Sequence, residues 1–285
     1  MSRKVELPES TSEHPVPAGS GRRSFFLRLA ALAGALIPLK AALAGTKDDP
    51  QDRVGALERE VESMKAHIGQ LEDSNAIRKL QYAYGYYLDK CLYEETVRLF
   101  ANDCEVRFMG GIWKGEAGAR RLYVDTFGAF FTDGKNGPLP GFLLDHLQLQ
   151  DIVDVAPDRS SAKARFRTLM QAGVHNDSEA PMARWSREQG RHPRQWWEGG
   201  IYENEYVRED GTWKIKVLNY NPLWHADFDK GWAYTKPEYI PAYAETWPDN
   251  PNGPDELDQD FLGLWPKTKT VPFHYEHPVT GEPWA

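Results

Sequence analysis

The most regular hydrophobic pattern of the chain lies between residues 54 and 71. Apolar side chains recur there at alternating spacings of three and four, at Val54, Leu57, Val61, Met64, Ile68 and Leu71. This spacing is typical of a helix whose apolar seam packs along another helix. We therefore expect a helix here, after a polar linker at 46–53. The pattern leaves open whether the seam pairs with a second subunit or docks on its own domain.

Helical patterns continue as far as residue 131. Asp73 or Ser74 is a suitable N-cap for a new helix over about 75–88. The stripe expected to be buried on that helix consists of Ile77, Leu80, Tyr84 and Tyr87. Two further helices are predicted at about 92–101 and 115–131, with a strand at 105–110 between them and a turn-rich loop at 134–140.

From residue 142 onwards the pattern changes to that of strands. Strands are predicted at 144–155 and 162–174, and a hairpin at 196–208 and 212–220 is turned by Asp210-Gly211. The polar stretch 176–195 is predicted to be a long loop, and the chain after residue 222 an irregular segment that packs through its aromatics. This order predicts an α+β fold with helices on one face of an antiparallel sheet.

Composition narrows the class of protein. Of the 285 residues, 41% are hydrophobic and 12% aromatic, which is typical of a globular protein. The formal net charge of −8 argues against nucleic acid as a partner, because phosphate binding needs clustered Lys and Arg. The two cysteines, Cys91 and Cys104, exclude a disulfide framework and a four-thiolate zinc site, and we interpret both as small buried residues.

The N-terminal segment resembles a bacterial twin-arginine signal peptide. Arg22-Arg23 precede Phe and Leu residues and a short apolar run at 29–39, and Ala42-Leu43-Ala44 form a small-x-small cleavage site. The resemblance predicts that 1–44 is removed and that the mature chain is periplasmic. The apolar run is too short to span a membrane, so no stable membrane insertion is expected after cleavage.

The rest of the chain resembles the SnoaL-like branch of the nuclear transport factor 2-like superfamily, and within it the scytalone dehydratase-like group. The resemblance covers residues 73–224 and rests on the segments 76–80, 86–90, 99–103, 145–146 and 206–215. It implies a curved antiparallel sheet forming a cone closed by three helices, with a small-molecule pocket inside. It also implies a homo-oligomer, a dimer or trimer, through the outer sheet face. Residues 45–72 remain as linker and heptad helix, and 225–285 as a Pro- and Trp-rich extension that is a candidate lid.

The same resemblance assigns a catalytic pair, Asp89 and His146. In the dehydratases these groups are hydrogen-bonded inside the cone. His146 is expected to act as general base and acid, and Asp89 to orient its imidazole, without metal or cofactor. Two structural alternatives stay open: Asp89 capping the following helix, and His146 as a core histidine bonded to a main-chain carbonyl.

The expected substrate-binding residues are Tyr86, Tyr87, Tyr202, Phe108 and Trp197. Phe108 stands where the dehydratases have a tyrosine, and their second pocket histidine is missing near residues 171–172. We interpret Tyr82 and Tyr84 as wall residues with hydroxyls in water. The predicted function is a cofactor-independent lyase that eliminates water or a small aldehyde from a small hydroxylated aromatic compound. The alternatives are a non-catalytic binding or scaffold module and a ketosteroid-type isomerase.

Overall fold

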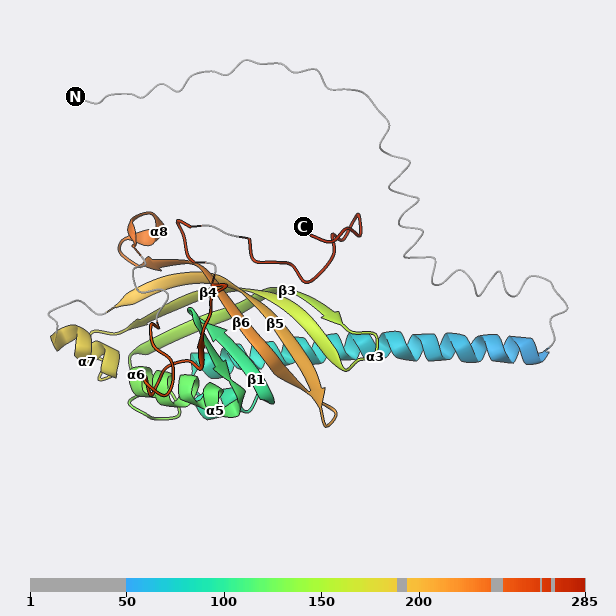
Figure 1. The fold of residues 1–285 in the computed structure, drawn as a ribbon, viewed down its shortest axis with the longest axis horizontal. Coiled ribbons are helices and arrows are strands. Elements are labelled where there is room, and N and C mark those ends of the chain that lie inside the picture. The colour runs from blue at the N-terminus through green and yellow to red at the C-terminus, as the bar shows by residue number, and fades with distance from the viewer. Residues whose placement is uncertain (1–49, 189–193, 237–242, 262, 268–269, 285) are drawn as a thin grey trace, which may run out of the picture. The chain divides into compact units, whose positions relative to one another are not determined.

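The computed structural model describes residues 50–188, 194–236, 243–261, 263–267 and 270–284 (Figure 1). The predicted signal peptide, 1–44, and the first part of the predicted linker lie outside the described residues. Within these ranges the structure contains no helix that is both long enough and apolar enough to cross a membrane.

Helix α3 (Pro50–Asp89) is a single helix of 40 residues. The predicted boundary at Asp73 or Ser74 is therefore wrong. Asp73 does not cap a helix, because its carboxylate accepts hydrogen bonds from other elements of the domain. The hydroxyl of Ser74 donates to the carbonyl of Gln70, one turn earlier, which is a bond made inside a helix.

One face of α3 packs on the domain, and it carries several polar side chains. Its buried residues are Gly69, Asp73, Ile77, Gln81, Tyr84, Gly85 and Leu88. Asp73 is 2% exposed and accepts bonds from Arg159 Nε at 2.5 Å, Arg208 Nη2 at 2.7 Å and Trp213 Nε1 at 2.9 Å. Burial raises the pKa of this carboxyl, but the bonds from Arg159 and Trp213 and the charge of Arg208 lower it more, so its pKa lies below the usual range.

Among the described residues, seven strands form one curved, open sheet in the order β3-β4-β5-β6-β1-β2-β7 (Figure 1). All neighbouring strands are antiparallel except β1 and β6, which are parallel. The strands are β1 (Phe100–Phe108), β2 (Gly111–Lys114), β3 (Phe142–Val155), β4 (Ser161–Val174), β5 (Gln195–Glu209), β6 (Thr212–Asp227) and β7 (Glu256–Leu257). The predicted α+β class and the hairpin turned at Asp210-Gly211 are confirmed.

Short helices lie beneath the curved strands (Figure 1). They are α4 (Tyr93–Val97), α5 (Gly115–Arg120), the π-helical segment η1 (Arg121–Phe127), α6 (Gly128–Thr132) and α7 (Pro181–Glu188). The predicted helix at 115–131 is thus present as three successive segments. The predicted loop at 176–195 is wrong in part, because α7 buries Met182, Ala183 and Ser186 against the sheet in spite of its polar composition.

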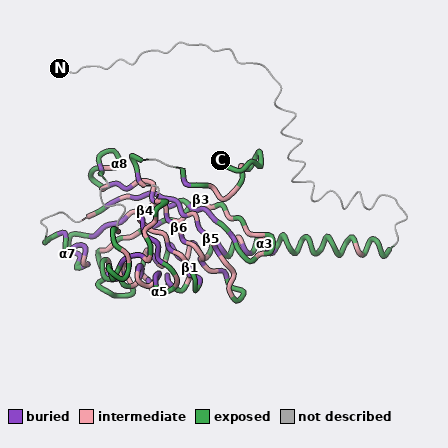
Figure 2. Tube along the Cα trace, in the orientation of Figure 1, coloured by how far each residue is buried: buried purple, intermediate pink, exposed green. Residues whose placement is uncertain are grey.

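The core lies between these helices and the inner face of the sheet, where purple buried positions concentrate in Figure 2. It is rich in aromatic side chains, and its fully buried members include Trp113, Tyr123, Phe166, Tyr202 and Tyr206. Cys91 and Cys104 are buried and unbridged, as predicted.

The C-terminal segment packs in two places. β7 extends the sheet beside β2, and the carboxylate of Asp255 accepts the main-chain N–H of Lys114 at 2.8 Å. Further on, Arg165 on β4 donates to the carbonyl of Val271 at 3.0 Å, and its guanidinium lies 4.0 Å from the ring centre of Phe273. This second contact covers part of the sheet.

We expect Asp73→Asn to lower the free energy of unfolding by about 2–3 kcal/mol, because it removes the charge that balances two partly buried arginines. The loss should shrink below about pH 4, since a carboxyl with a lowered pKa stabilises the fold above its unfolded pKa, 3.8, and loses that effect as pH falls through its folded pKa. Urea unfolding followed by tryptophan fluorescence measures both effects. Glu205→Gln, at an exposed ion pair with Lys163, is the control and should change stability by less than about 0.5 kcal/mol. Equal losses in both variants would contradict the anchoring role of Asp73.

Candidate functional site

An aromatic cavity of about 260 Å³ lies within the core and is lined by residues of α3, α4, η1, α6, α7 and five strands. Twelve of its lining residues are Phe, Tyr or Trp. Phe108 is one of them, and its ring stacks on Tyr220 with centroids 5.9 Å apart. We name this space the aromatic cavity. Apart from tyrosine hydroxyls, the polar side chains in its walls are Thr126, His146, Arg194, Glu198 and His225, and their positions determine what the cavity can do chemically.

His146 is the first of these polar groups. It points inward from β3, is 5% exposed, and its Nε2 lies 3.3 Å from the hydroxyl oxygen of Tyr202. Within the described part of the chain, its buried Nδ1 has no hydrogen-bond partner. This excludes the alternative of a core histidine satisfied by a described main-chain carbonyl. Burial lowers the pKa of His146 to about 4, against a smaller raising effect from the charge of Glu198, so the imidazole is neutral near pH 7.

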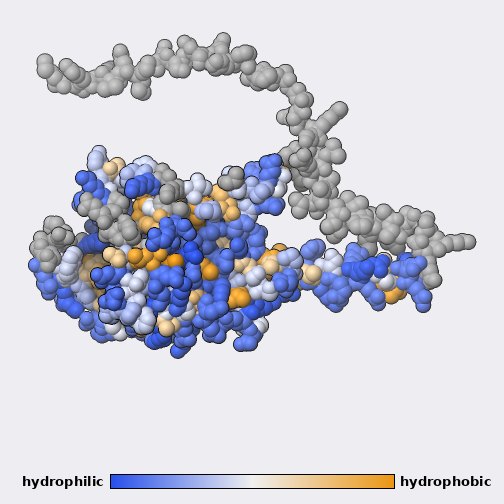
Figure 3. All heavy atoms as spheres, viewed as in Figure 1, coloured by the Kyte–Doolittle hydropathy of each residue, from blue (hydrophilic) through white to orange (hydrophobic). Residues whose placement is uncertain are grey.

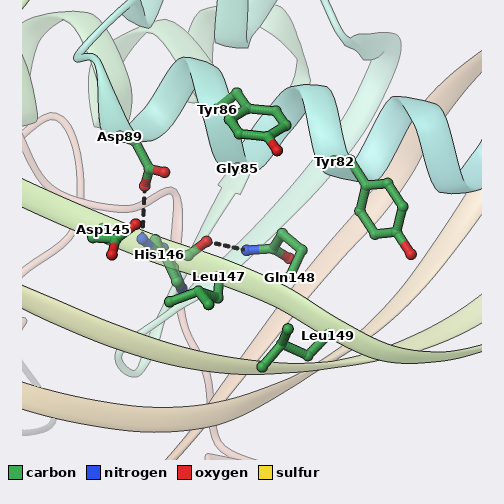
Figure 4. A pocket seen from close by; sticks show the side chains of 9 residues that line it. All are labelled: Tyr82, Gly85, Tyr86, Asp89, Asp145, His146, Leu147, Gln148 and Leu149. Carbon is green, nitrogen blue, oxygen red and sulfur yellow. Dashed lines mark hydrogen bonds between the residues drawn. The ribbon is translucent and has the colours of Figure 1, made fainter.

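Asp89 contacts His146 through the main chain, in a surface groove between α3 and β3 (Figure 4). Its Oδ1 accepts the main-chain N–H of His146 at 2.8 Å, and Gln148 Nε2 donates to the carbonyl of the same residue at 3.1 Å. The predicted bond from Asp89 to the imidazole is therefore not the one present. β3 is an edge strand, so its outward N–H and C=O groups need acceptors and donors from α3 and from side chains.

The surroundings of Asp89 shift the pKa of its carboxyl. Burial raises its pKa to about 6, the N–H of His146 lowers it, and the charge of Asp145 raises it further. Asp89 is the last residue of α3 and does not cap α4, whose N-cap is Leu92. The carboxylate thus holds the edge strand that carries His146, at some cost in electrostatic free energy.

A second polar cluster faces the aromatic cavity from the hairpin β5–β6. Glu198 and His225 are paired in register, and both are nearly fully buried. Glu198 Oε2 lies 2.9 Å from His225 Nδ1, and Glu198 Oε1 accepts the hydroxyl of Tyr220 at 2.5 Å. Arg194 Nη2 lies 3.4 Å from His225 Nε2. These contacts hold the Glu198 carboxylate beside the cavity.

The other predicted binding residues separate into two groups. Tyr202 and Phe108 line the aromatic cavity. Tyr86 is 72% exposed and lines the surface groove, and Tyr87 is partly buried and does not line the cavity. Trp197 stacks on Phe228 with centroids 6.3 Å apart, also outside it. The structure therefore brings together His146, Tyr202 and Phe108 and leaves the other three elsewhere.

Sequence reasoning missed Glu198 and His225. It correctly placed Tyr84 in the buried stripe of its helix but wrongly assigned the Tyr84 hydroxyl to water, because this hydroxyl is hydrogen-bonded to Tyr123 at 3.0 Å in the cavity wall. For Glu198 the sequence contained a signal. Residues separated by an even number of positions on a strand share a face, so counting back four from Tyr202 places Glu198 on the same face.

In the C-terminal extension, 225–285, the aromatic residues that suggested a lid do not line the aromatic cavity, whereas another residue of the extension does. Phe228, Trp232 and Tyr234, which motivated that expectation, are between 55% and 80% exposed and do not line the aromatic cavity. Tyr243 does line it. β6 continues to Asp227, so the first residues of the predicted extension belong to the sheet.

A sequence model of the SnoaL-like domain matches residues 69–219, more than half of the 285-residue chain. The chain belongs to the SnoaL-like family. The match begins inside α3 and ends inside β6, so the SnoaL-like domain includes His146, Tyr202 and Glu198. No curated protein matches the chain.

Several solved structures are similar to this SnoaL-like chain. A scytalone dehydratase-like protein from Novosphingobium aromaticivorans is 20% identical, covers 58% of this chain and 91% of its own, and has a TM-score of 0.43. A hexachlorocyclohexane dehydrochlorinase, LinA-type3, from Novosphingobium barchaimii is 18% identical, covers 57% and 94%, and has a TM-score of 0.44. A protein described as of unknown function from Mycobacterium tuberculosis is 15% identical, covers 54% and 79%, and has a TM-score of 0.40.

We expect Asp89→Asn to gain stability relative to the native chain as pH rises from about 4 to 7. A carboxyl whose folded pKa, about 6, exceeds its unfolded value, 3.8, binds more protons when folded, so native stability falls across this window. Because Asp89 is only partly buried, the relative gain should be about 1 kcal/mol. Chemical unfolding at several pH values measures it, with the exposed Asp177→Asn as control. A difference in unfolding free energy between Asp89→Asn and the native chain that does not change with pH would contradict the raised pKa of Asp89.

Proposed function

We propose that this SnoaL-like protein is a cofactor-independent lyase that eliminates water or a small aldehyde from a small hydroxylated aromatic compound. The observation that carries the proposal is His146, a buried neutral imidazole whose Nδ1 has no partner among the described residues, in a wall of the aromatic cavity. The twin-arginine pattern at Arg22-Arg23 makes the periplasm the proposed location.

The cavity supports an aromatic substrate of limited size. An apolar cavity of about 150 Å³ holds benzene, so about 260 Å³ has room for one ring with small substituents. Rings such as Phe108, Tyr220 and Trp196 offer edges and faces for contact with a substrate ring. A substrate hydroxyl then supplies the polar group that pairs with the imidazole of His146.

The proposed chemistry needs one proton to leave the substrate and one to return. For loss of water, His146 takes a proton from carbon, the electron pair forms the double bond, the carbon–oxygen bond breaks, and the proton passes to the departing oxygen. For loss of an aldehyde, His146 takes the hydroxyl proton, the carbon–carbon bond breaks as the carbonyl forms, and the proton passes to the carbon left behind. The imidazole ends neutral in both cases.

Glu198, rather than Asp89, is the carboxylate that supports this cycle. His146 carries a positive charge midway through the cycle. The negative charge of Glu198 stabilises this charged form, as its raising effect on the pKa of the imidazole shows. Tyr220 and His225 hold Glu198 in place. Asp89 serves as a positioning residue, because it binds the main chain of the strand that carries His146.

Two other functions use the same fold. A scaffold module needs a core filled by its own side chains, and the cavity of about 260 Å³ does not favour it. A ketosteroid-type isomerase needs a carboxylate base that faces the ligand without a histidine. Glu198 is bonded to His225, and Asp89 does not line the aromatic cavity.

The test measures turnover of a panel of one-ring aryl alcohols and aryl 1,3-diols with a chelator present. Alkene absorbance detects loss of water, and an aldehyde assay detects release of a small aldehyde. We expect His146→Phe to lower kcat/KM by about 10²–10⁴-fold. His175→Ala, at an exposed loop histidine, should keep the native rate. Activity that depends on the neutral imidazole should fall only as pH approaches about 4.

A His146→Phe variant as active as the native chain on a genuine substrate would overturn the assignment of His146. A native chain that binds these compounds, detected by quenching of its tryptophans, and turns over none of them would be a binding module.

We further expect Glu198→Gln to lower kcat by about 10- to 100-fold and to lower the pKa of His146 below its native value of about 4. The imidazole proton shifts in an NMR titration report that pKa directly, and a purely structural role for Glu198 would leave it unchanged. Glu205→Gln is the matched control, because it lies on the same strand but faces outward. An unchanged pKa would reject Glu198 as the counter-charge.

A further inference from the structure

The apolar seam of helix α3 is not covered by any of the residues that the structure describes. Its six residues are between 42% and 66% exposed: Val54, Leu57, Val61, Met64, Ile68 and Leu71. The exposed stretch is green in Figure 2, and Figure 3 shows orange hydrophobic atoms among the blue surface of this helix. Met64, Ile68 and Leu71 belong to the same compact unit as the sheet, and the described residues of that unit do not cover them, so docking on the chain's own domain is not the arrangement of this part of the seam.

The seam and the docked face of α3 are distinct surfaces. At 3.6 residues per turn, the seam lies roughly 180° around the helix axis from the buried residues Gly69, Asp73 and Ile77. Ile68 and Leu71 are exposed although their neighbours Gly69 and Asp73 are buried. A partner helix can therefore reach the seam while the other face stays in contact with the sheet.

The residue types in the seam select a geometry. The first position of each heptad is β-branched, at Val54, Val61 and Ile68, and the fourth is Leu57, Met64 or Leu71. In parallel coiled coils, β-branched residues at the first position with leucine at the fourth favour two strands over three or four. Methionine is a flexible substitute for leucine at such a position.

The charges that flank the seam agree with this geometry. In a parallel pair of identical helices, the residue that directly precedes the first position of a heptad faces the residue five positions later on the partner helix. The three facing pairs are Arg53 with Glu58, Glu60 with Lys65, and His67 with Glu72. Two of these are opposite charges, and the third places a histidine next to a carboxylate.

An antiparallel pair centred on the same seam places residue 54 opposite residue 71 of the second helix. Glu58 then lies nearest Lys65 and Glu60 nearest His67, whereas Arg53 faces Ser74 and Glu72 faces Gln51. The parallel pair therefore matches more of the flanking charges than the antiparallel pair does.

We propose that the seam of α3 is an interface with a second copy of this chain, forming a parallel two-stranded coiled coil. Because the seam spans only between two and three heptads, the association should depend on concentration. The proposal is independent of the lyase function, since no seam residue lines the aromatic cavity or the surface groove.

The first experiment measures the mass of the purified full-length chain by sedimentation over a dilution series. We expect twice the mass of one chain at high concentration, and one chain mass for Leu57→Glu/Met64→Glu under the same conditions. Ala56→Glu/Ser63→Glu adds the same charges at exposed positions one residue outside the seam and should remain a dimer. Circular dichroism verifies that each variant keeps its sheet.

The second experiment tests orientation with Val54→Cys. In a parallel pair the two introduced thiols face each other, and mild oxidation should cross-link the dimer. In an antiparallel pair each introduced thiol lies opposite residue 71 of the partner helix, so the two thiols are about 25 Å apart along the helix axis. Ala56→Cys, outside the seam, should cross-link far less. Cys91 and Cys104 are buried and should not interfere.

Three results would overturn the proposal: a native chain that is monomeric throughout, a Leu57→Glu/Met64→Glu variant that is still dimeric, or a dimer that Val54→Cys does not cross-link. The second result would place the interface elsewhere, for example on the outer sheet face. Loss of the dimer in Ala56→Glu/Ser63→Glu as well would equally reject the seam as the specific surface.

Discussion

The buried carboxylate of Asp73 is the contact on which the placement of helix α3 depends. It receives bonds from Arg159 in the β3–β4 turn, from Arg208 at the end of β5, and from Trp213 at the start of β6. One side chain thus ties the helix to two hairpins. Because α3 is continuous from this anchor to Asp89, the anchor also sets where Asp89 meets the edge strand β3. The position of that strand, in turn, determines the position of His146.

Inside the domain, the cost of burying charge decides which groups can act. The aromatic walls keep His146 neutral, and the charge of Glu198 opposes that effect. Asp89 lies on the other side of β3, where its carboxylate satisfies a main-chain N–H. The two carboxylates therefore have different tasks. One shapes the electrostatics of the cavity, and the other supports the strand that forms its wall.

Helix α3 also shows how one element can carry two unrelated surfaces. The face with Gly69 and Asp73 contains polar groups that are all paired within the domain, whereas the face with Ile68 and Leu71 is apolar and exposed. Burying the first face needs specific partners, because unpaired polar groups are costly in a core. Burying the second needs only a matching apolar stripe with suitable flanking charges.

Local patterns in the sequence were sufficient for the strands, the turn at Asp210-Gly211 and the helical seam, because each depends on residues close together in the chain. The pattern and the family resemblance also brought His146 and Tyr202 to the same cavity. They failed where a residue's partner is distant in sequence. Asp73 has the chemistry of a cap, and only tertiary contacts made it a buried anchor. Likewise, whether Asp89 meets an imidazole or a main-chain N–H depends on which way β3 faces α3, and spacing along the chain carries no information about that.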